Sequence, residues 1–104
     1  MPSPFGPSVS FAFGGSGTGP VQTNPAGAPV PGLLGQVGEF SGIFSGVADP
    51  DALYVIWSGA NDYLLAGAPP PAAGFTPDPT ITSANIGDAI GGLHAAGAKN
   101  FLVD

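Results

Sequence analysis

An unbroken apolar run covers residues 52–57, Ala-Leu-Tyr-Val-Ile-Trp, and lies between an Asp-Pro-Asp turn and the segment 58–62, Ser-Gly-Ala-Asn-Asp. A run of this length, rich in aliphatic and aromatic residues, is typical of a strand buried on both faces. Such strands usually belong to parallel sheets covered by helices, where the chemistry lies just beyond the carboxyl ends of the strands. The pattern therefore predicts a central strand over residues 52–57 and places residues 58–62 where an active site would be.

The spacing of apolar residues predicts a first helix over residues 32–45. Its apolar stripe consists of Leu33, Val37, Phe40 and Phe44. Glycines occupy the opposite face, and because each interior glycine costs about 1 kcal/mol relative to alanine, this helix needs tertiary packing to form. The glycines form either a close-packing face or, in the interpretation we favour, a poor solvent face; they are Gly35, Gly38, Gly42 and Gly46.

A second helix is predicted to begin at Thr82 or Ser83, since either residue can cap it. It should end at Gly97, because glycine is favoured just past the end of a helix. Its apolar side is formed by Ile86, Ile90 and Leu93. The following residues 100–104, Asn-Phe-Leu-Val-Asp, predict a second buried strand.

The remaining segments are predicted to be a short strand and loops. Residues 9–13 alternate loosely and predict a strand that leads into the glycine-rich turn 14–20. Residues 21–31 and 66–79 are dense in turn-forming and small residues, which predicts loops. Alternating helices and strands indicate an α/β fold with a parallel sheet. Because the chain stops at Asp104, where a strand should deliver its polar end, we expect the domain to be incomplete.

Composition narrows the classes of partner. The 104 residues are enough for one domain at most, and only 8% are charged, against roughly 25% in ordinary soluble domains. The net charge is −6 with Lys99 as the single basic residue, which argues against nucleic acid and against anionic membrane surfaces. No cysteine is available for a disulfide or a thiolate metal site.

No apolar run approaches the roughly 20 residues of a transmembrane helix, and no signal-peptide pattern is visible.

The glycine-rich turn 14–20 does not match the known phosphate-binding and nucleophile motifs. Its glycine spacing departs from Gly-x-Gly-x-x-Gly, and no Gly-Lys-Ser/Thr follows, as a P-loop requires. Ser16 stands in Gly-Gly-Ser-Gly-Thr, which lacks the last glycine of the Gly-x-Ser-x-Gly elbow. We therefore interpret Ser16 as a turn serine and not as a nucleophile.

The titratable residues also have simpler explanations than catalysis. His94 is predicted on the exposed side of the second helix, whereas a general base must reach the reacting group at a strand end. The carboxylates are predicted to lie in turns or at helix starts, where turn and capping roles explain them; they are Asp49, Asp51, Asp78 and Asp88. No cluster has metal-ligand spacing, so neither a metal nor a cofactor is predicted.

Asn61 and the glycine turn are the remaining candidates. A side-chain NH₂ and a backbone N–H at neighbouring strand ends can both point at one developing oxyanion. Without a nucleophile, such a pair of neutral donors is half of an acyl-transfer site. The alternative is that residues 59–62 form an ordinary turn, and the residue types leave the two interpretations equal.

Four stretches in order carry a family resemblance: Phe-Ala-Phe-Gly-Gly-Ser-Gly-Thr-Gly (11–19), Leu-Gly-Gln-Val (34–37), Asp-Pro-Asp-Ala-Leu-Tyr-Val-Ile-Trp-Ser-Gly-Ala-Asn-Asp-Tyr (49–63) and Gly-Ala-Lys-Asn-Phe-Leu-Val (97–103). Together they resemble the middle of the SGNH hydrolases, the GDSL-type lipases and esterases. Gly-Ala-Asn-Asp alone is a weak motif; its specificity comes from the preceding Asp-Pro-Asp-Ala-Leu-Tyr-Val and the upstream Ala-Phe-Gly-Gly turn.

The resemblance implies a flavodoxin-like three-layer α/β/α fold and hydrolysis of carboxylic esters through an acyl-enzyme, with an ester or lipid as substrate and no cofactor. Gly15 matches the glycine that supplies an oxyanion-hole N–H. Gly14, one position earlier, is the alternative match. Asn61 matches the oxyanion-hole asparagine, and Gly59 matches the glycine before it. Relatives are often exported, so the resemblance is compatible with an extracellular or cell-envelope location.

The chain departs from the family at both ends. No Gly-Asp-Ser precedes Phe11 and no Asp-x-x-His follows the last strand, so the nucleophile and base motifs are absent. We expect the chain to carry only the oxyanion half of the site and to be inactive alone. The alternative is a non-catalytic remnant or interaction domain that associates through exposed sheet edges, including with a second copy of itself.

Overall fold

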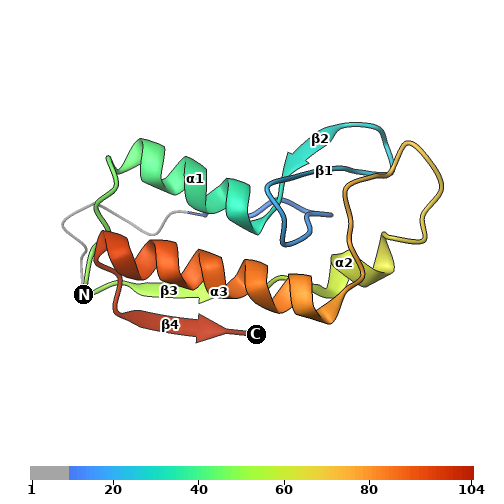
Figure 1. Ribbon diagram of the computed structural model, residues 1–104. Helices are drawn as coiled ribbons and strands as arrows, with labels where there is room; N and C mark the ends of the chain where they lie inside the picture. The colour runs from blue at the N-terminus through green and yellow to red at the C-terminus, as the bar shows by residue number, and fades with distance from the viewer. Residues whose placement is uncertain (1–9) are drawn as a thin grey trace.

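A pair of parallel strands forms the central sheet of the computed structural model, which describes residues 10–104 (Figure 1). Strand β3 (Leu53–Ile56) pairs with β4 (Asn100–Val103) in register from end to end. The N–H of Asp104 extends this ladder by donating to the carbonyl of Ile56 at 2.8 Å. The predicted strands over residues 52–57 and 100–104 thus form within those ranges as adjacent parallel strands, and the fold is mixed α/β, as predicted.

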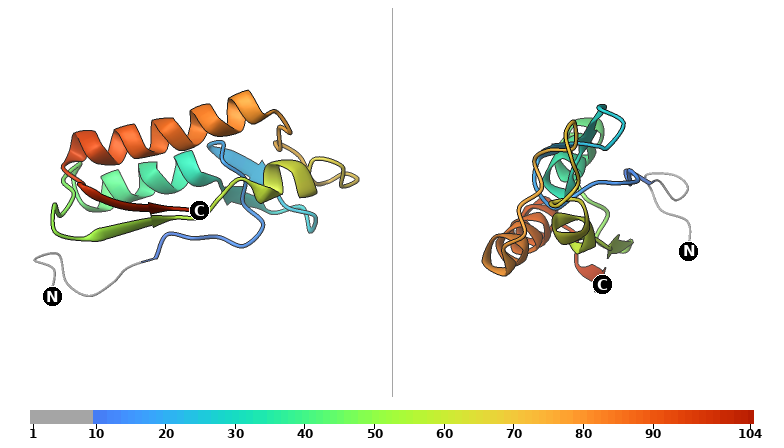
Figure 2. Two further views of the ribbon diagram at one scale, coloured as in Figure 1. Left: turned by 90° about the horizontal axis from the view of Figure 1, so that it is seen from below. Right: turned by 90° about the vertical axis from the view of Figure 1, so that its right-hand side faces the viewer.

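Two helices cover one face of this sheet (Figure 2). Helix α1 (Leu33–Ile43) and helix α3 (Pro79–Ala96) pack against each other over the strands, while the short α2 (Ala60–Leu64) follows β3. The predicted helix over residues 32–45 is confirmed. Its glycines do not share one role: a Cβ on Gly38 or Gly42 would meet nothing within 4 Å, whereas one on Gly35 would lie 2.2 Å from the carbonyl oxygen of Pro20.

Helix α3 begins earlier than Thr82 or Ser83, so the predicted cap is wrong. Asp78 is the N-cap residue, and its carboxylate accepts a hydrogen bond from the N–H of Thr80 at 2.9 Å. Pro79 occupies the first helical position, where the missing N–H costs nothing and the fixed φ suits the helix. The predicted end is confirmed, because Gly97 stops the helix at φ 120°.

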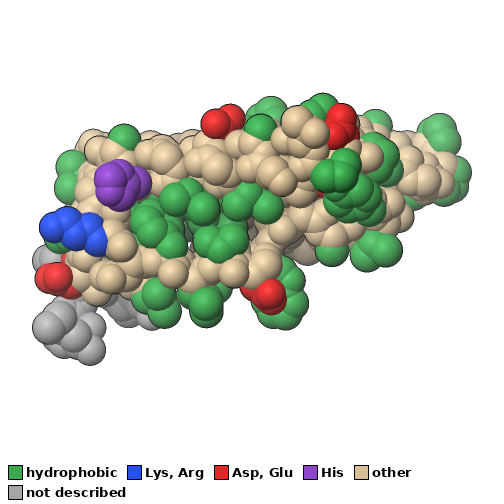
Figure 3. Space-filling view, turned by 60° about the horizontal axis from the view of Figure 1, so that its bottom comes forward, with side chains coloured by type: hydrophobic (Ala, Val, Ile, Leu, Met, Phe, Trp, Pro, Cys, Tyr) green, Lys and Arg blue, Asp and Glu red, His purple; other side chains and the backbone are tan. Residues whose placement is uncertain are grey.

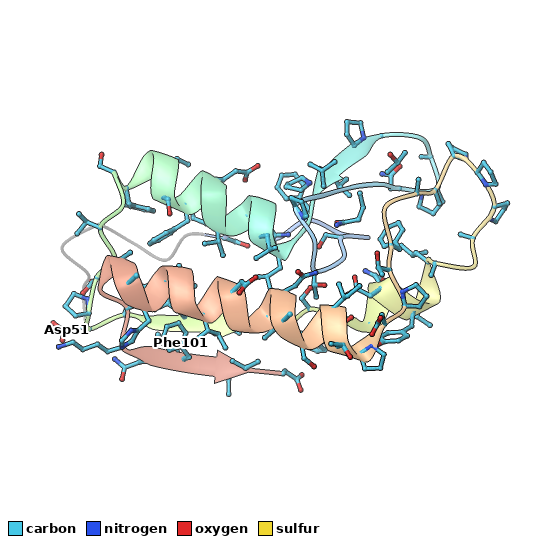
Figure 4. The ribbon with its side chains drawn as sticks, viewed as in Figure 1. Asp51 and Phe101 are labelled. Atoms are coloured by element: carbon cyan, nitrogen blue, oxygen red, sulfur yellow. The ribbon has the colours of Figure 1, made fainter. Side chains whose placement is uncertain are left out.

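The core lies between the helices and the sheet and is small. Its buried apolar residues are Leu33, Ala48, Ile56, Ala89, Leu93 and Ala98. Aromatic rings extend it along the inner face of the sheet: Tyr54 packs against Phe40 and Phe101, with both centroid distances 5.9 Å. Phe101 lies on the side of β4 that faces α3 (Figure 4). Burial raises the pKa of the Tyr54 phenol, whose hydroxyl donates to the carbonyl of Asp49 at 2.9 Å.

The other face of the sheet is exposed, which contradicts the predictions that the central strand is buried on both faces and that residues 100–104 form a second buried strand. Leu53 is 62% exposed, Val55 61%, Trp57 80% and Leu102 56%. Alternate residues of each strand point away from the helices, and among residues 10–104 no element covers them. Hydrophobic side chains also show along the flank between α3 and β4 (Figure 3).

Residues 21–31, predicted to be a loop, form an antiparallel hairpin of β1 (Val21–Thr23) and β2 (Pro29–Pro31). A bridge between Thr23 and Ala73 ties this hairpin to the long loop after α2. The density of proline and glycine obscured the hairpin because its strands are only three residues long. The strand predicted over residues 9–13 does not form at residues 10–13, and residue 9 lies outside the described part.

Within residues 10–104, none of the helices combines the length and the apolar character that crossing a membrane would require.

Candidate active site

Two segments far apart in the sequence meet beyond the carboxyl end of β3. One is the glycine turn over residues 13–16, and the other runs from Trp57 through Asn61. Together they line an open hollow of about 260 Å³. Among residues 10–104 no charged side chain lines it; the lining residues are Phe13, Gly14, Gly15, Ser16, Trp57, Ser58, Gly59, Ala60 and Asn61. The structure therefore brings Gly15 and Asn61, the sequence-predicted site residues, to one place.

The turn depends on Gly15. The N–H of Ser16 reaches back to the carbonyl of Phe13 at 3.4 Å, which closes a four-residue turn. Gly15 is the third residue of this turn and has φ +79°, a conformation that glycine adopts at little cost. Gly14 has no positive φ, so the turn distinguishes the two rival glycines. Within residues 10–104 the Gly15 N–H has no hydrogen-bond partner, which leaves it available to a ligand.

Asn61 lies in the first turn of α2, directly after the bend at Gly59. Gly59 is the N-cap residue with φ 121°, a backbone geometry that an L-residue rarely adopts. The Asn61 side-chain NH₂ donates one hydrogen bond to the carbonyl of Ser16 at 3.0 Å. An asparagine NH₂ has two hydrogens, and the second has no partner among residues 10–104. The amide is thus held in place by one hydrogen while the other stays available.

Neighbouring residues hold the glycine turn against α1. The Gly17 N–H donates to Gln22 Oε1 at 2.9 Å, and the carbonyls of Gly17 and Thr18 accept the first N–H groups of α1, from Leu33 at 2.9 Å and Leu34 at 3.2 Å. Gln36 Nε2 also donates to Ser16 Oγ at 3.2 Å. Residues 16–18 are therefore anchored, and Gly14 and Gly15, which line the hollow, directly precede them.

Asp62 is the residue of this region that the sequence analysis missed. It is only 3% exposed, and its carboxylate accepts hydrogen bonds from the Thr18 N–H at 2.9 Å, from the Thr18 hydroxyl and from the Thr82 hydroxyl at 2.7 Å. Asn85 supports the group by donating to Thr18 Oγ1 at 3.0 Å. The one hint in the sequence was that Asp62 directly follows Asn61 in Gly-Ala-Asn-Asp. The residues that hydrogen-bond to Asp62 could not be predicted, because Thr18 and Thr82 lie 44 and 20 positions away along the chain.

The other sequence candidates lie elsewhere or have structural roles. His94 is exposed in the last turn of α3, at the end of the helix that leads into β4 and so away from the carboxyl ends of the strands. Asp78 caps α3, and Asp49 accepts from the N–H of Asp51 at 2.9 Å in the turn before β3. Asp88 lies in the middle of α3, so the prediction that it marks a turn or a helix start is wrong.

Comparisons of this chain with family models, with curated proteins and with solved structures found no match.

The turn geometry predicts different effects for two adjacent glycines. Gly15→Ala should lower the free energy of unfolding by about 1–2 kcal/mol, because an L-residue at positive φ costs about that much. Gly14→Ala is the matched control: a Cβ there would meet nothing within 4 Å, and the change should be neutral or stabilise by up to about 1 kcal/mol. Urea denaturation followed by circular dichroism measures both. Equal unfolding free energies would contradict the turn assigned to Gly15.

Proposed function

We propose that residues 13–16 and 57–61 form the oxyanion-binding half of an SGNH-type carboxylic ester hydrolase site. The observation that carries this proposal is the hydrogen bond from the Asn61 side chain to the carbonyl of Ser16, at 3.0 Å. It places the free amide hydrogen of Asn61 beside the turn that presents the Gly15 N–H, and both residues line the same hollow.

The chemistry of the hollow is compatible with stabilising a developing negative charge. In ester hydrolysis the carbonyl oxygen becomes an oxyanion in the tetrahedral intermediate, and preorganised N–H donors stabilise it. Gly15 would supply a backbone N–H and Asn61 a side-chain N–H. Among residues 10–104 no carboxylate lines the hollow, so no negatively charged side chain borders it directly.

The proposal extends to the fold and the substrate class. The parallel pair of β3 and β4, joined through α3, is compatible with one helix layer and part of the sheet of a flavodoxin-like α/β/α arrangement, which we propose for the family domain. The substrate would be a small ester or a lipid ester, in keeping with the resemblance of residues 49–63. No cofactor enters the proposed chemistry.

This chain alone should not turn over esters through a serine nucleophile. The Gly-Asp-Ser and Asp-x-x-His motifs are absent from its sequence, and covalent catalysis needs an activated nucleophile with a base in reach. With p-nitrophenyl butyrate we expect no burst of p-nitrophenol and no stable acyl-enzyme by mass spectrometry. A stoichiometric burst that Ser16→Ala abolishes would overturn this expectation and make Ser16 the nucleophile.

The oxyanion half can be tested without catalysis. Monomethyl hexylphosphonate, a tetrahedral monoanion, should shift the NMR signals of the Gly15 amide and the Asn61 side-chain amide together. Asn61→Asp removes the NH₂ and should weaken binding by about 10- to 100-fold, because a hydrogen bond to a charged group contributes about 1.5–3 kcal/mol.

The matched control for this experiment is Asn24→Asp in the hairpin loop, which makes the same charge change. It also keeps the Oδ1 atom that accepts from the Ala28 N–H at 2.9 Å. This variant should bind the phosphonate as the unaltered chain does. If the unaltered chain gives no shifts at Gly15 and Asn61, the proposed oxyanion role is wrong.

The exposed sheet favours a second candidate function, association through β3 and β4. The outer face presents Leu53, Val55, Trp57 and Leu102, all more than half exposed. Among residues 10–104, β3 also has no strand partner on the edge opposite β4. Unpaired strand edges and contiguous apolar faces are typical of surfaces that bind other chains.

Self-association predicts that the apparent size in light scattering rises with protein concentration. Val55→Lys places a charge on the outer face and should abolish that rise. Val47→Lys is the control, because Val47 is 52% exposed but precedes the strand. A concentration-independent monomer would rule out this candidate, and equal effects of both variants would place the contact elsewhere.

A further inference from the structure

The Asp62 carboxylate is buried, and no cationic group among residues 10–104 is paired with it. Lys99, the single basic residue, is exposed just before β4, whereas Asp62 is 3% exposed in α2. Its negative charge is instead balanced by neutral donors: Oδ1 accepts from the Thr18 N–H, and Oδ2 from the hydroxyls of Thr18 and Thr82. Burying a carboxylate is costly unless hydrogen bonds compensate, so these donors must stay in place for the fold to hold it.

Two adjacent side chains of α2 bind the same short segment. Asn61 donates to the carbonyl of Ser16 at 3.0 Å, and Asp62 accepts from the N–H of Thr18 at 2.9 Å. These contacts lie just after Gly15 and fix the direction in which the chain leaves the turn. Space is tight as well, because a Cβ on Gly17 would lie 2.5 Å from Asp62 Oδ1.

We propose that Asp62 is a positioning residue, which sets the placement of the Gly15 N–H relative to the Asn61 amide by holding Thr18. Thr82 acts with it, because its hydroxyl fixes the carboxylate from α3 at 2.7 Å. The inference rests on the oxyanion role proposed above for Gly15 and Asn61. It adds that the two donors converge only while Asp62 binds both the glycine segment and α3.

A purely structural role for Asp62 makes a different prediction. In that case, weakening its hydrogen bonds would lower stability but leave ligand affinity unchanged at temperatures where the variant stays folded. A positioning role requires affinity to fall in the folded protein, because misplaced donors no longer meet one oxygen together. The two roles therefore separate on binding measured well below the unfolding transition.

The test compares three variants of the full chain with the unaltered protein. Thr82→Val keeps the shape of the side chain and removes one hydrogen bond to Oδ2, while Asp62→Asn keeps the shape and removes the charge. Asp51→Asn is the control with the same charge change at an exposed turn residue at the opposite end of β3 (Figure 4). Monomethyl hexylphosphonate is titrated at low temperature, with the Gly15 amide and Asn61 side-chain NMR signals as readouts.

We expect Thr82→Val and Asp62→Asn to bind the phosphonate about tenfold more weakly or worse, and Asp51→Asn to bind as the unaltered chain does. In ligand-free protein, the Gly15 and Asn61 signals should move in the first two variants and not in the control. These shifts would show that the donors themselves have been displaced.

The outcomes separate this inference from the proposed function. If the unaltered chain does not bind the phosphonate, the oxyanion role fails and the inference fails with it. If the unaltered chain binds and both Thr82→Val and Asp62→Asn bind equally well, only the positioning role is overturned. Should Asp62→Asn not fold, Thr82→Val decides alone, since it leaves the carboxylate and one of its hydroxyl donors intact.

Discussion

The hydrogen bonds of the buried Asp62 carboxylate connect three parts of the chain that the sequence separates. They join the glycine segment at Thr18, the short helix α2 and the start of α3 at Thr82. A buried charge is tolerated only when its hydrogen bonds are made, so these segments cannot move independently without a large cost. The hollow between the glycine turn and Asn61 therefore has a defined shape, although most of its lining belongs to loops.

The sheet contributes little to stability, and its main role is to position the residues that follow β3. Two short strands are marginal alone and need a packed helix layer, which α1 and α3 supply on one face only. The core is correspondingly small, and several of its members are alanines, whose side chains bury little apolar area. The sheet does position part of the hollow, because β3 ends at Ile56 and the next residues, 57–61, line the hollow.

The sequence allowed much of this layout to be predicted, and its errors have physical reasons. Helix α1, the end of α3 at Gly97 and both parallel strands follow from apolar spacing and from the glycine preference at helix ends. The start of α3 was misplaced because Asp78 and Pro79 begin the helix about two turns before Ile86, the first apolar residue of its stripe. The hairpin over residues 21–31 was missed because its register depends on partners across a loop and on the bridge to Ala73.

The sequence by itself determined helix α1, the end of α3 at Gly97 and the two parallel strands, and it singled out Gly15 and Asn61 as candidate donors through local patterns and family resemblance. Only the tertiary structure decided that these two residues share one hollow, that Asp62 is buried and bound to Thr18 and Thr82, and that one face of the sheet stays exposed. Local patterns report on neighbours along the chain. Three-dimensional packing decides which distant residues meet and which are buried. It also decides that the Asp62 carboxylate accepts from donors 44 and 20 positions away.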